Sequence, residues 1–243
     1  MKRREFLFGI GLGGIGLDWF PFFHPKFVTL AGIPFQVLRN GRSHRRYLLI
    51  HGDEPTAREV LTIHMETHPG IAYLVAGKER NVPLDVGKLD PNRMFSRIGA
   101  EANLKKLNPD WTPEKLARAL DFLDDERETL VGRLTPPEGG LLIALHNNRN
   151  YSVQDEVADS DRVSIKQPER PREFFLCTDP RDYAVLVKSP YNVVLQNRKP
   201  AIDDGSLSRL AAHRGFRYVN LECGVGQFEA QIERLGWADR NLV

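Results

Sequence analysis

Two short apolar runs, each leading to a histidine, constrain the fold of this chain most strongly. The run Tyr47–Ile50 precedes His51, and the run Leu141–Leu145 precedes His146. Uninterrupted apolar runs of this length are typical of strands that are buried on both faces. A buried strand that stops at a histidine delivers an imidazole to the sheet edge, where open α/β folds bind their ligands. The sequence therefore predicts two imidazoles at the edge of a covered sheet.

The rest of the chain alternates between strand patterns and helix patterns. Further strands are expected at 35–38, 71–76, 81–86, 174–177, 191–196 and 216–221, and helices at 55–68, 111–134, 180–188, 203–214 and 226–236. Strands that alternate with helices indicate a mostly parallel sheet covered by helices. The polar stretch 147–172 is expected to be a long surface loop, a kind of segment that is often functional.

Three local signals place boundaries within this pattern. Pro55 and the Thr112-Pro113 pair each mark the start of a helix. Asn40-Gly41 is the pair that tight hairpin turns prefer, so strands 35–38 and 46–50 are expected to form a hairpin around it.

Composition narrows the class of protein. The chain has 243 residues, 41% hydrophobic and 27% charged, as in an ordinary globular protein. Its net charge of +2 gives no basic footprint for nucleic acid, so we expect no nucleic-acid partner. Two cysteines, Cys177 and Cys223, are too few for a disulfide scaffold or a cysteine-zinc site. They could pair with each other in an oxidising compartment, but free thiols in strands are favoured.

The N-terminus has the pattern of an export signal. Lys2-Arg3-Arg4 precedes a glycine-rich apolar run that ends near Leu17 and is too short to span a bilayer comfortably. Adjacent arginines followed by Phe-Leu are typical of a twin-arginine signal, although a Sec signal or an N-terminal tether fits the same run. We expect a signal over 1–31, a domain over 32–243 and a periplasmic or extracellular protein with no other membrane span; Thr29-Leu30-Ala31 is a weak cleavage site.

The two histidine strands, together with a nearby glutamate, also contain possible ligands for a metal ion. His51 is followed three residues later by Glu54, which would lie where the helix at Pro55 begins. Two imidazoles and one carboxylate, from His51, Glu54 and His146, would leave a fourth zinc position open for water, as in catalytic zinc sites. A rival pair, His64 and His68, lies four residues apart on the same helix. It lacks the glutamate that zinc proteases place after the first histidine, so two ordinary histidines are favoured.

Further segments appear in order along the chain. Asp90-Pro91-Asn92-Arg93-Met94-Phe95 lies between the two histidine runs, and Glu222-Cys223-Gly224 ends a later strand pattern. Together with His51-Gly52-Asp53-Glu54 and His146-Asn147, these segments resemble the zinc carboxypeptidase superfamily, in particular its succinylglutamate desuccinylase/aspartoacylase branch. The resemblance covers roughly residues 35 to 237 through four short motifs.

The resemblance implies a fold, a cofactor and roles for single residues. It implies a single α/β domain with a mixed, mostly parallel central sheet, one Zn²⁺ per chain held by His51, Glu54 and His146, and hydrolysis of an amide bond next to a carboxylate. Glu222 would act as general base and then acid, and Arg93 with Asn92 would bind a substrate carboxylate.

Two departures leave the substrate open. Ala144 stands where the family often has an aspartate, and four residues compete for a tyrosine or arginine that completes the site: Arg149, Tyr151, Tyr183 and Tyr191. The partner is expected to be a small peptide or an acyl-amino acid. An N-acyl amino acid deacylase and a non-catalytic zinc- or ligand-binding protein are the alternatives.

Overall fold

A computed structural model describes residues 26–85, 87–198 and 203–243. Most of the predicted export signal therefore lies outside the described residues, and it stays a prediction. Its last residues, Lys26–Leu30, form an edge strand paired with Ile33–Val37, so cleavage after Ala31 would remove a strand from the sheet. None of the described helices combines the length and the apolar character needed to cross a bilayer.

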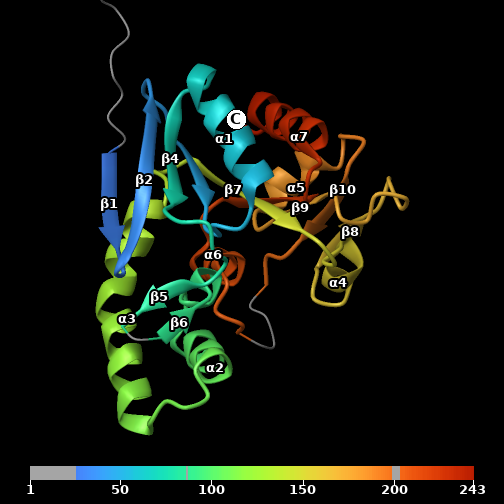
Figure 1. The fold of residues 1–243 in the computed structure, drawn as a ribbon. Coiled ribbons are helices and arrows are strands. Elements are labelled where there is room, and N and C mark those ends of the chain that lie inside the picture. The colour runs from blue at the N-terminus through green and yellow to red at the C-terminus, as the bar shows by residue number, and fades with distance from the viewer. Residues whose placement is uncertain (1–25, 86, 199–202) are drawn as a thin grey trace, which may run out of the picture.

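The described chain forms one mixed sheet with helices on both faces (Figure 1). The strands are β1 Lys26–Leu30, β2 Ile33–Asn40, β3 Arg45–Leu49, β4 Gly70–Val75, β7 Leu141–Asn148, β8 Arg162–Ser164, β9 Phe174–Cys177, β10 Asn192–Leu195 and β11 Tyr218–Gly224. Their order in the sheet is β1-β2-β4-β3-β7-β11-β9-β10-β8, and a separate two-stranded sheet pairs β5 Val82–Leu84 with β6 Gly87–Leu89.

The centre of the sheet is parallel and its flanks are mixed. β4, β3, β7 and β11 run parallel to one another, whereas β1, β2 and β8 pair antiparallel. β9 is antiparallel to β11 and parallel to β10. The single α/β domain with a mixed sheet, parallel at its core, is thus confirmed.

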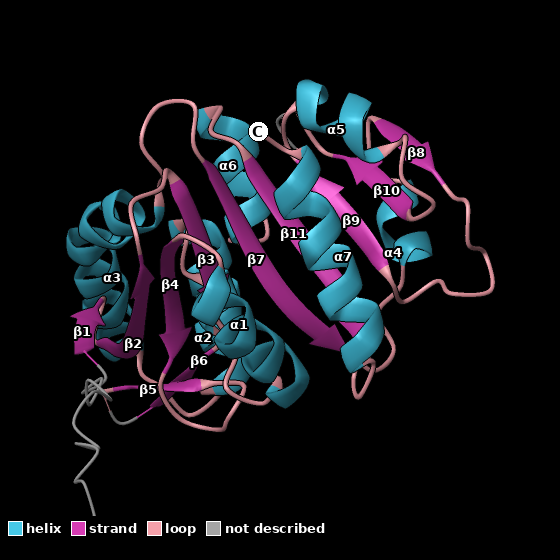
Figure 2. Cartoon of the chain, turned by 90° about the horizontal axis from the view of Figure 1, so that it is seen from above, coloured by secondary structure: helices cyan, strands magenta, loops and turns pink. Residues whose placement is uncertain are grey.

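Two layers of helices cover the sheet (Figure 2). The helices are α1 Pro55–Thr67, η1 Pro91–Arg93, α2 Arg97–Leu107, α3 Pro113–Leu134, α4 Val153–Val157, α5 Pro180–Leu186, α6 Leu207–Arg214 and α7 Phe228–Asn241. Alternate residues of the strands pack against opposite layers, because side chains of a strand alternate between its faces. Leu142 and Ala144 share a core with α2, α3 and α6, while Ile143 and Leu145 share one with α1, α5 and α7.

Most predicted elements are present, with two differences. The hairpin around Asn40-Gly41 is wrong, because β4 lies between β2 and β3. Gly41 does turn the chain with a positive φ of 56°, but the two strands that it joins are not neighbours. The stretch 147–172 is not a plain loop, since it holds the end of β7 and also α4 and β8.

Both cysteines are free and buried, as expected. Cys177 ends β9 and Cys223 lies in β11, and each packs in the apolar core on the α7 side of the sheet.

Candidate active site

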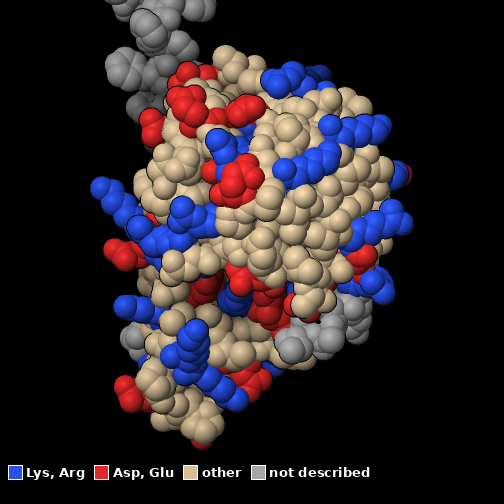
Figure 3. Space-filling model, turned by 90° about the vertical axis from the view of Figure 1, so that its right-hand side faces the viewer, with Lys and Arg blue, Asp and Glu red and all other residues tan. Residues whose placement is uncertain are grey.

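A cavity of about 590 Å³ opens at the carboxyl ends of β3, β7 and β11. Figure 3 shows a hollow on one face of the molecule where acidic and basic side chains lie close together. All six predicted site residues line this cavity: His51, Glu54, Asn92, Arg93, His146 and Glu222.

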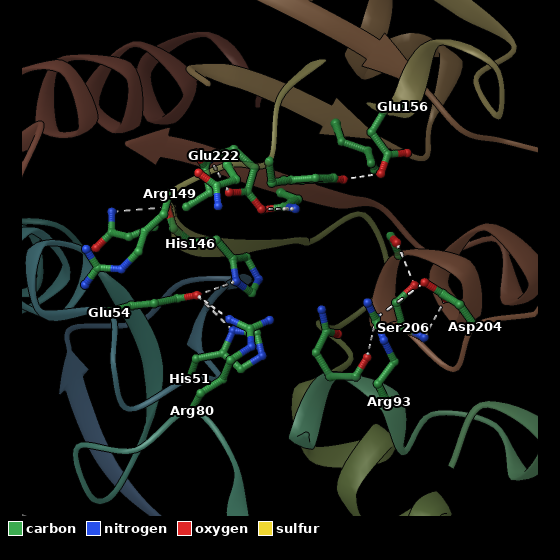
Figure 4. A pocket seen from close by; sticks show the side chains of 18 of the residues that line it. His51, Glu54, Arg80, Arg93, His146, Arg149, Glu156, Asp204, Ser206 and Glu222 are labelled. Carbon is green, nitrogen blue, oxygen red and sulfur yellow. Dashed lines mark hydrogen bonds and ion pairs between the residues drawn. The ribbon is translucent and has the colours of Figure 1, made fainter. Parts of the chain in front are cut away.

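His51 and Glu54 are placed by the turn from β3 into α1. Glu54 is the N-cap residue of α1, yet its side chain makes no capping bond to the helix. Instead, its Oε1 lies 2.8 Å from Nδ1 of His51, and both side chains are almost fully buried (Figure 4). The expectation that the Glu54 carboxylate folds back beside the imidazole is confirmed.

His146 approaches the same carboxylate from the sheet. Its strand does not end there, as the apolar run had suggested, but continues to Asn148. His146 shares the face of β7 with Ala144, and its Nδ1 lies 3.3 Å from the same Oε1 of Glu54. The His51 and His146 rings meet edge to face, with centroids 5.2 Å apart. Three side chains from distant segments therefore converge on one buried point.

Asn147 fixes the position of α1 relative to β7. Its Oδ1 accepts a hydrogen bond of 2.7 Å from the backbone N–H of Ala57, a donor in the first turn of α1. Its Nδ2 donates to Oε1 of Gln231 in α7, and Nε2 of Gln231 donates to the carbonyl of His146. Because a first-turn N–H needs an acceptor from outside the helix, Asn147 caps α1 in place of Glu54. The Glu54 carboxylate is thereby left for the two imidazoles.

Asp90 holds the far side of the His51 ring. Its Oδ1 lies 2.9 Å from Nε2 of His51, the nitrogen that faces away from Glu54. Burial opposes a charge on His51, but the hydrogen bonds and charges of Asp90 and Glu54 outweigh it and raise the pKa of His51 to about 9. Burial likewise opposes the carboxylate of Glu54, yet the two histidines lower its pKa to about 2.

These contacts suit a metal ion in chemistry and in geometry. The ligand atoms of His51, Glu54 and His146 all lie within 4.8 Å of one another, so the three residues can hold one ion. With a proton on Nε2 donated to Asp90, Nδ1 of His51 presents a lone pair to Glu54, and only a cation or a second proton can lie between them. The second carboxylate oxygen of Glu54 is buried and has no hydrogen-bond partner among the residues that the structure describes. Two imidazoles and one carboxylate are also the donor set of many catalytic zinc sites.

Glu222 lies on β11 directly beside His146 of β7 in the parallel register. Its two carboxylate oxygens accept hydrogen bonds from the side-chain amides of Asn148, at 3.0 Å, and Asn220, at 3.1 Å. Burial is the main cause that raises the pKa of this carboxyl, and it outweighs the nearby histidine and the two amide donors. The arrangement holds a carboxylate of increased basicity at the wall of the cavity.

Asn92 and Arg93 lie in η1, on the opposite wall. The Asn92 Oδ1 accepts a hydrogen bond from the backbone of Leu207 at the start of α6. Arg93 reaches into the cavity and forms a half-exposed ion pair with Asp204, at 3.4 Å (Figure 4). Glycine is required beside this pair, because a Cβ on Gly205, which has a φ of +76°, would lie 2.3 Å from the Arg93 carbonyl.

Arg80 is a site residue that the sequence did not reveal. Its guanidinium lies 3.4 Å from Asp90 and 3.8 Å from Glu54, and its side chain is 46% exposed. The segment that carries it packs tightly on Gly52, where an added Cβ would lie 2.6 Å from the Glu79 carbonyl. The glycine after His51 therefore lets this segment bring a cation to the candidate metal ligands. A polar turn such as 77–80 gives no signal of this role in the sequence.

The structure shows which of the four candidates for the additional tyrosine or arginine lie at the cavity. Arg149 and Tyr151 line the cavity, and the Tyr151 hydroxyl is hydrogen-bonded to the Glu156 carboxylate. Tyr183 and Tyr191 instead pack in the core under α5 and α7. Only the first two can therefore contact a molecule in the cavity.

The chain is similar to three solved structures of low sequence identity. One is the product-bound ectoine utilization protein EutE (DoeB) from Ruegeria pomeroyi, with 16% identity, 85% of this chain and 59% of that chain covered, and a TM-score of 0.41. Another is a succinylglutamate desuccinylase/aspartoacylase from Rhodobacter sphaeroides, with 16% identity, coverage of 85% and 58%, and a TM-score of 0.43. A putative metallopeptidase from Shewanella baltica OS155 has 11% identity, coverage of 87% and 83%, and a TM-score of 0.43.

The chain spans less than two thirds of the first two structures that it matches. No protein-family model and no curated protein matches the chain.

Proposed function

We propose that the protein is a zinc-dependent hydrolase that cleaves a peptide or acyl-amide bond next to a carboxylate. The observation that carries this proposal is the convergence of His51, Glu54 and His146 in a cavity that also holds Glu222 and Arg93. His51, Glu54 and His146 would hold the ion. When bound, zinc supplies Lewis-acid polarisation of a carbonyl and lowers the pKa of a water molecule.

Glu222 is the proposed proton carrier. Amide hydrolysis forms a bond between the carbonyl carbon and the water oxygen and breaks the bond from that carbon to nitrogen. A raised pKa makes the Glu222 carboxylate a better base for the proton of the attacking water. The protonated carboxyl then gives this proton to the departing nitrogen. Asn148 and Asn220 hold the carboxylate in one position, so little reorganisation accompanies the transfer.

Cationic side chains at the cavity walls account for the proposed substrate class. Arg93 is half-exposed toward the cavity and can exchange its pairing with Asp204 for a bidentate pair with a substrate carboxylate. The side-chain amide nitrogen of Asn92 makes no hydrogen bond within the described residues, and it can donate to the same carboxylate. Arg80 lies next to Glu54 and is the cation best placed to stabilise negative charge on the carbonyl oxygen.

The test combines metal analysis with a substrate panel. Purified protein is expected to contain a metal ion that His146→Ala releases, whereas His44→Ala, a change at an exposed histidine outside the cavity, retains it. Dipeptides and N-acyl amino acids are then compared with analogues that have an amide in place of the free carboxylate. Release of an amine from the carboxylate-bearing compounds alone is the expected result. A wild-type protein that takes up no zinc would end the proposal.

A further inference from the structure

A second group of possible metal ligands lies at the C-terminal end of α1, away from the candidate active site. His64 and His68 project from this helix, and Asp239 projects from α7, which packs beside it on the same face of the sheet (Figure 2). One ligand atom from each of the three residues lies within 4.8 Å of the other two. Glu54 and His64 are ten residues apart, or about 15 Å along the helix axis. This group is therefore separate from the candidate active site.

The hydrogen bonds of His68 leave one of its nitrogens free for a metal. Its Nδ1 lies 3.1 Å from the backbone carbonyl oxygen of His64. Because a carbonyl oxygen can only accept a hydrogen bond, Nδ1 must carry the proton. A proton on Nδ1 leaves the lone pair on Nε2, which can then bind a metal. The ring stacks on that of His64, with centroids 3.8 Å apart and an angle of 10°. Both imidazoles therefore lie on the same side of the helix.

The two carboxylate oxygens of Asp239 have different partners. Oδ1 accepts a hydrogen bond of 2.8 Å from the Tyr47 hydroxyl and lies 3.3 Å from Nε of Arg45. Oδ2 faces Nε2 of His64 at 3.3 Å. Since the Tyr47 proton is used on Oδ1, it is not available to His64. The contact between Oδ2 and Nε2 is therefore made either by an N–H of His64 that donates to Oδ2 or by a metal ion that both atoms bind.

The spacing of these atoms agrees with a metal. Two ligands at 2.0–2.1 Å from a tetrahedral zinc lie roughly 3.3 Å apart, and this is the distance between Oδ2 of Asp239 and Nε2 of His64. His64 is buried, whereas His68 and Asp239 are partly exposed, so an ion can reach the group from solvent.

We propose that His64, His68 and Asp239 form a second binding site for a divalent transition metal, such as Zn²⁺, that joins α1 to α7. Two imidazoles favour first-row transition metals over Mg²⁺ or Ca²⁺, which prefer oxygen ligands. The positive charge of Arg45 lies against the Asp239 carboxylate and weakens the binding of a cation there. The sequence alone favours two ordinary histidines here, since the third ligand comes from the other end of the chain.

The experiment counts zinc ions bound to the full chain by equilibrium dialysis. Wild type is expected to bind two ions, His68→Phe one, His146→Ala one and the double variant none. Phenylalanine keeps a ring to stack on His64 but has no ligand atom, and His44→Ala serves as the control that keeps both ions. Zinc is also expected to raise the melting temperature of His146→Ala but not that of the double variant. Equal metal-free melting temperatures of His68→Phe and wild type would show that the loss is one of ligation.

Other outcomes separate this site from the first. Wild type could bind only one ion, which His146→Ala removes and His68→Phe retains. This result would overturn the second site, since His64 would then simply donate an N–H to Asp239, and it would leave the proposed hydrolase intact. One ion that His68→Phe removes and His146→Ala retains would support the second site and refute the proposed function.

Discussion

Asp90 provides the sharpest test of how the candidate metal site is held. Asp90→Asn keeps an oxygen that can accept from Nε2 of His51 and from the backbone N–H of Asn92, which the Asp90 side chain now does at 2.9 Å each. The substitution therefore removes the negative charge and leaves the ring of His51 in position. We expect it to weaken zinc binding without unfolding the site.

The size of the effect follows from the geometry. An ion bound at Nδ1 of His51 would lie roughly 7 Å from the Asp90 carboxylate, and a unit charge at that distance stabilises a divalent ion by about 1 kcal/mol even at the dielectric constant of water. Loss of a carboxylate partner of a metal-bound histidine typically costs 10- to 100-fold in affinity, or about 1.4–2.7 kcal/mol. We therefore expect the dissociation constant for zinc to rise by about 10- to 100-fold.

Competition with a chromophoric zinc chelator measures this change. Asp53→Asn is the matched control, because it also removes one negative charge. Asp53 lies between His51 and Glu54 in the sequence, but its side chain is exposed to solvent. This substitution should change the affinity by less than about threefold, since exposed charges are screened. Equal losses in the two variants, or no loss in Asp90→Asn, would refute the idea that the hydrogen bond from His51 to Asp90 supports the metal.

Three further predictions concern the proton carrier, the substrate and pH. Glu222→Gln should keep the metal but lower kcat by about 10²- to 10⁴-fold, and unchanged turnover would remove Glu222 from the mechanism. Arg93→Ala should raise KM for carboxylate-bearing substrates more than for their amides; equal effects would make Arg93 structural. In metal-free protein the pKa of His51 is raised from 6.5 to about 9, so its contribution of about 3 kcal/mol is complete below pH 6.5 and is lost as pH rises through 9. Urea unfolding with a chelator at pH 6 and pH 10 should show this loss in wild type and not in His51→Gln.

Local signals in the sequence were sufficient to predict where two helices begin. Pro55 begins α1 as predicted, and the Thr112 hydroxyl caps α3 by accepting from the N–H of Lys115. Both signals depend on residues within one turn of the helix, so they act in any tertiary context. The grouping of His51, Glu54 and His146 was also predicted, because two strands of one parallel sheet bring their carboxyl ends together.

Long-range contacts explain what the sequence did not predict. Asn40-Gly41 reverses the chain, but the pairing of β2 is decided by β4, which follows thirteen residues of helix. The role of Arg80 depends on the close approach of its loop to Gly52. Asn147 was recognised only as a motif residue, and its bond to Ala57 joins segments ninety positions apart in the chain. None of these contacts leaves a periodic or compositional trace.

The side-chain amide of Asn147 positions two of the three candidate metal ligands at once. His146 precedes Asn147 in the strand, and Glu54 stands at the helix end that Asn147 caps. A change at this one position would shift both ligands together, so the coordination geometry is a property of how a helix meets the sheet. Loops around the cavity can therefore diverge while the framework that positions the candidate ligands stays the same.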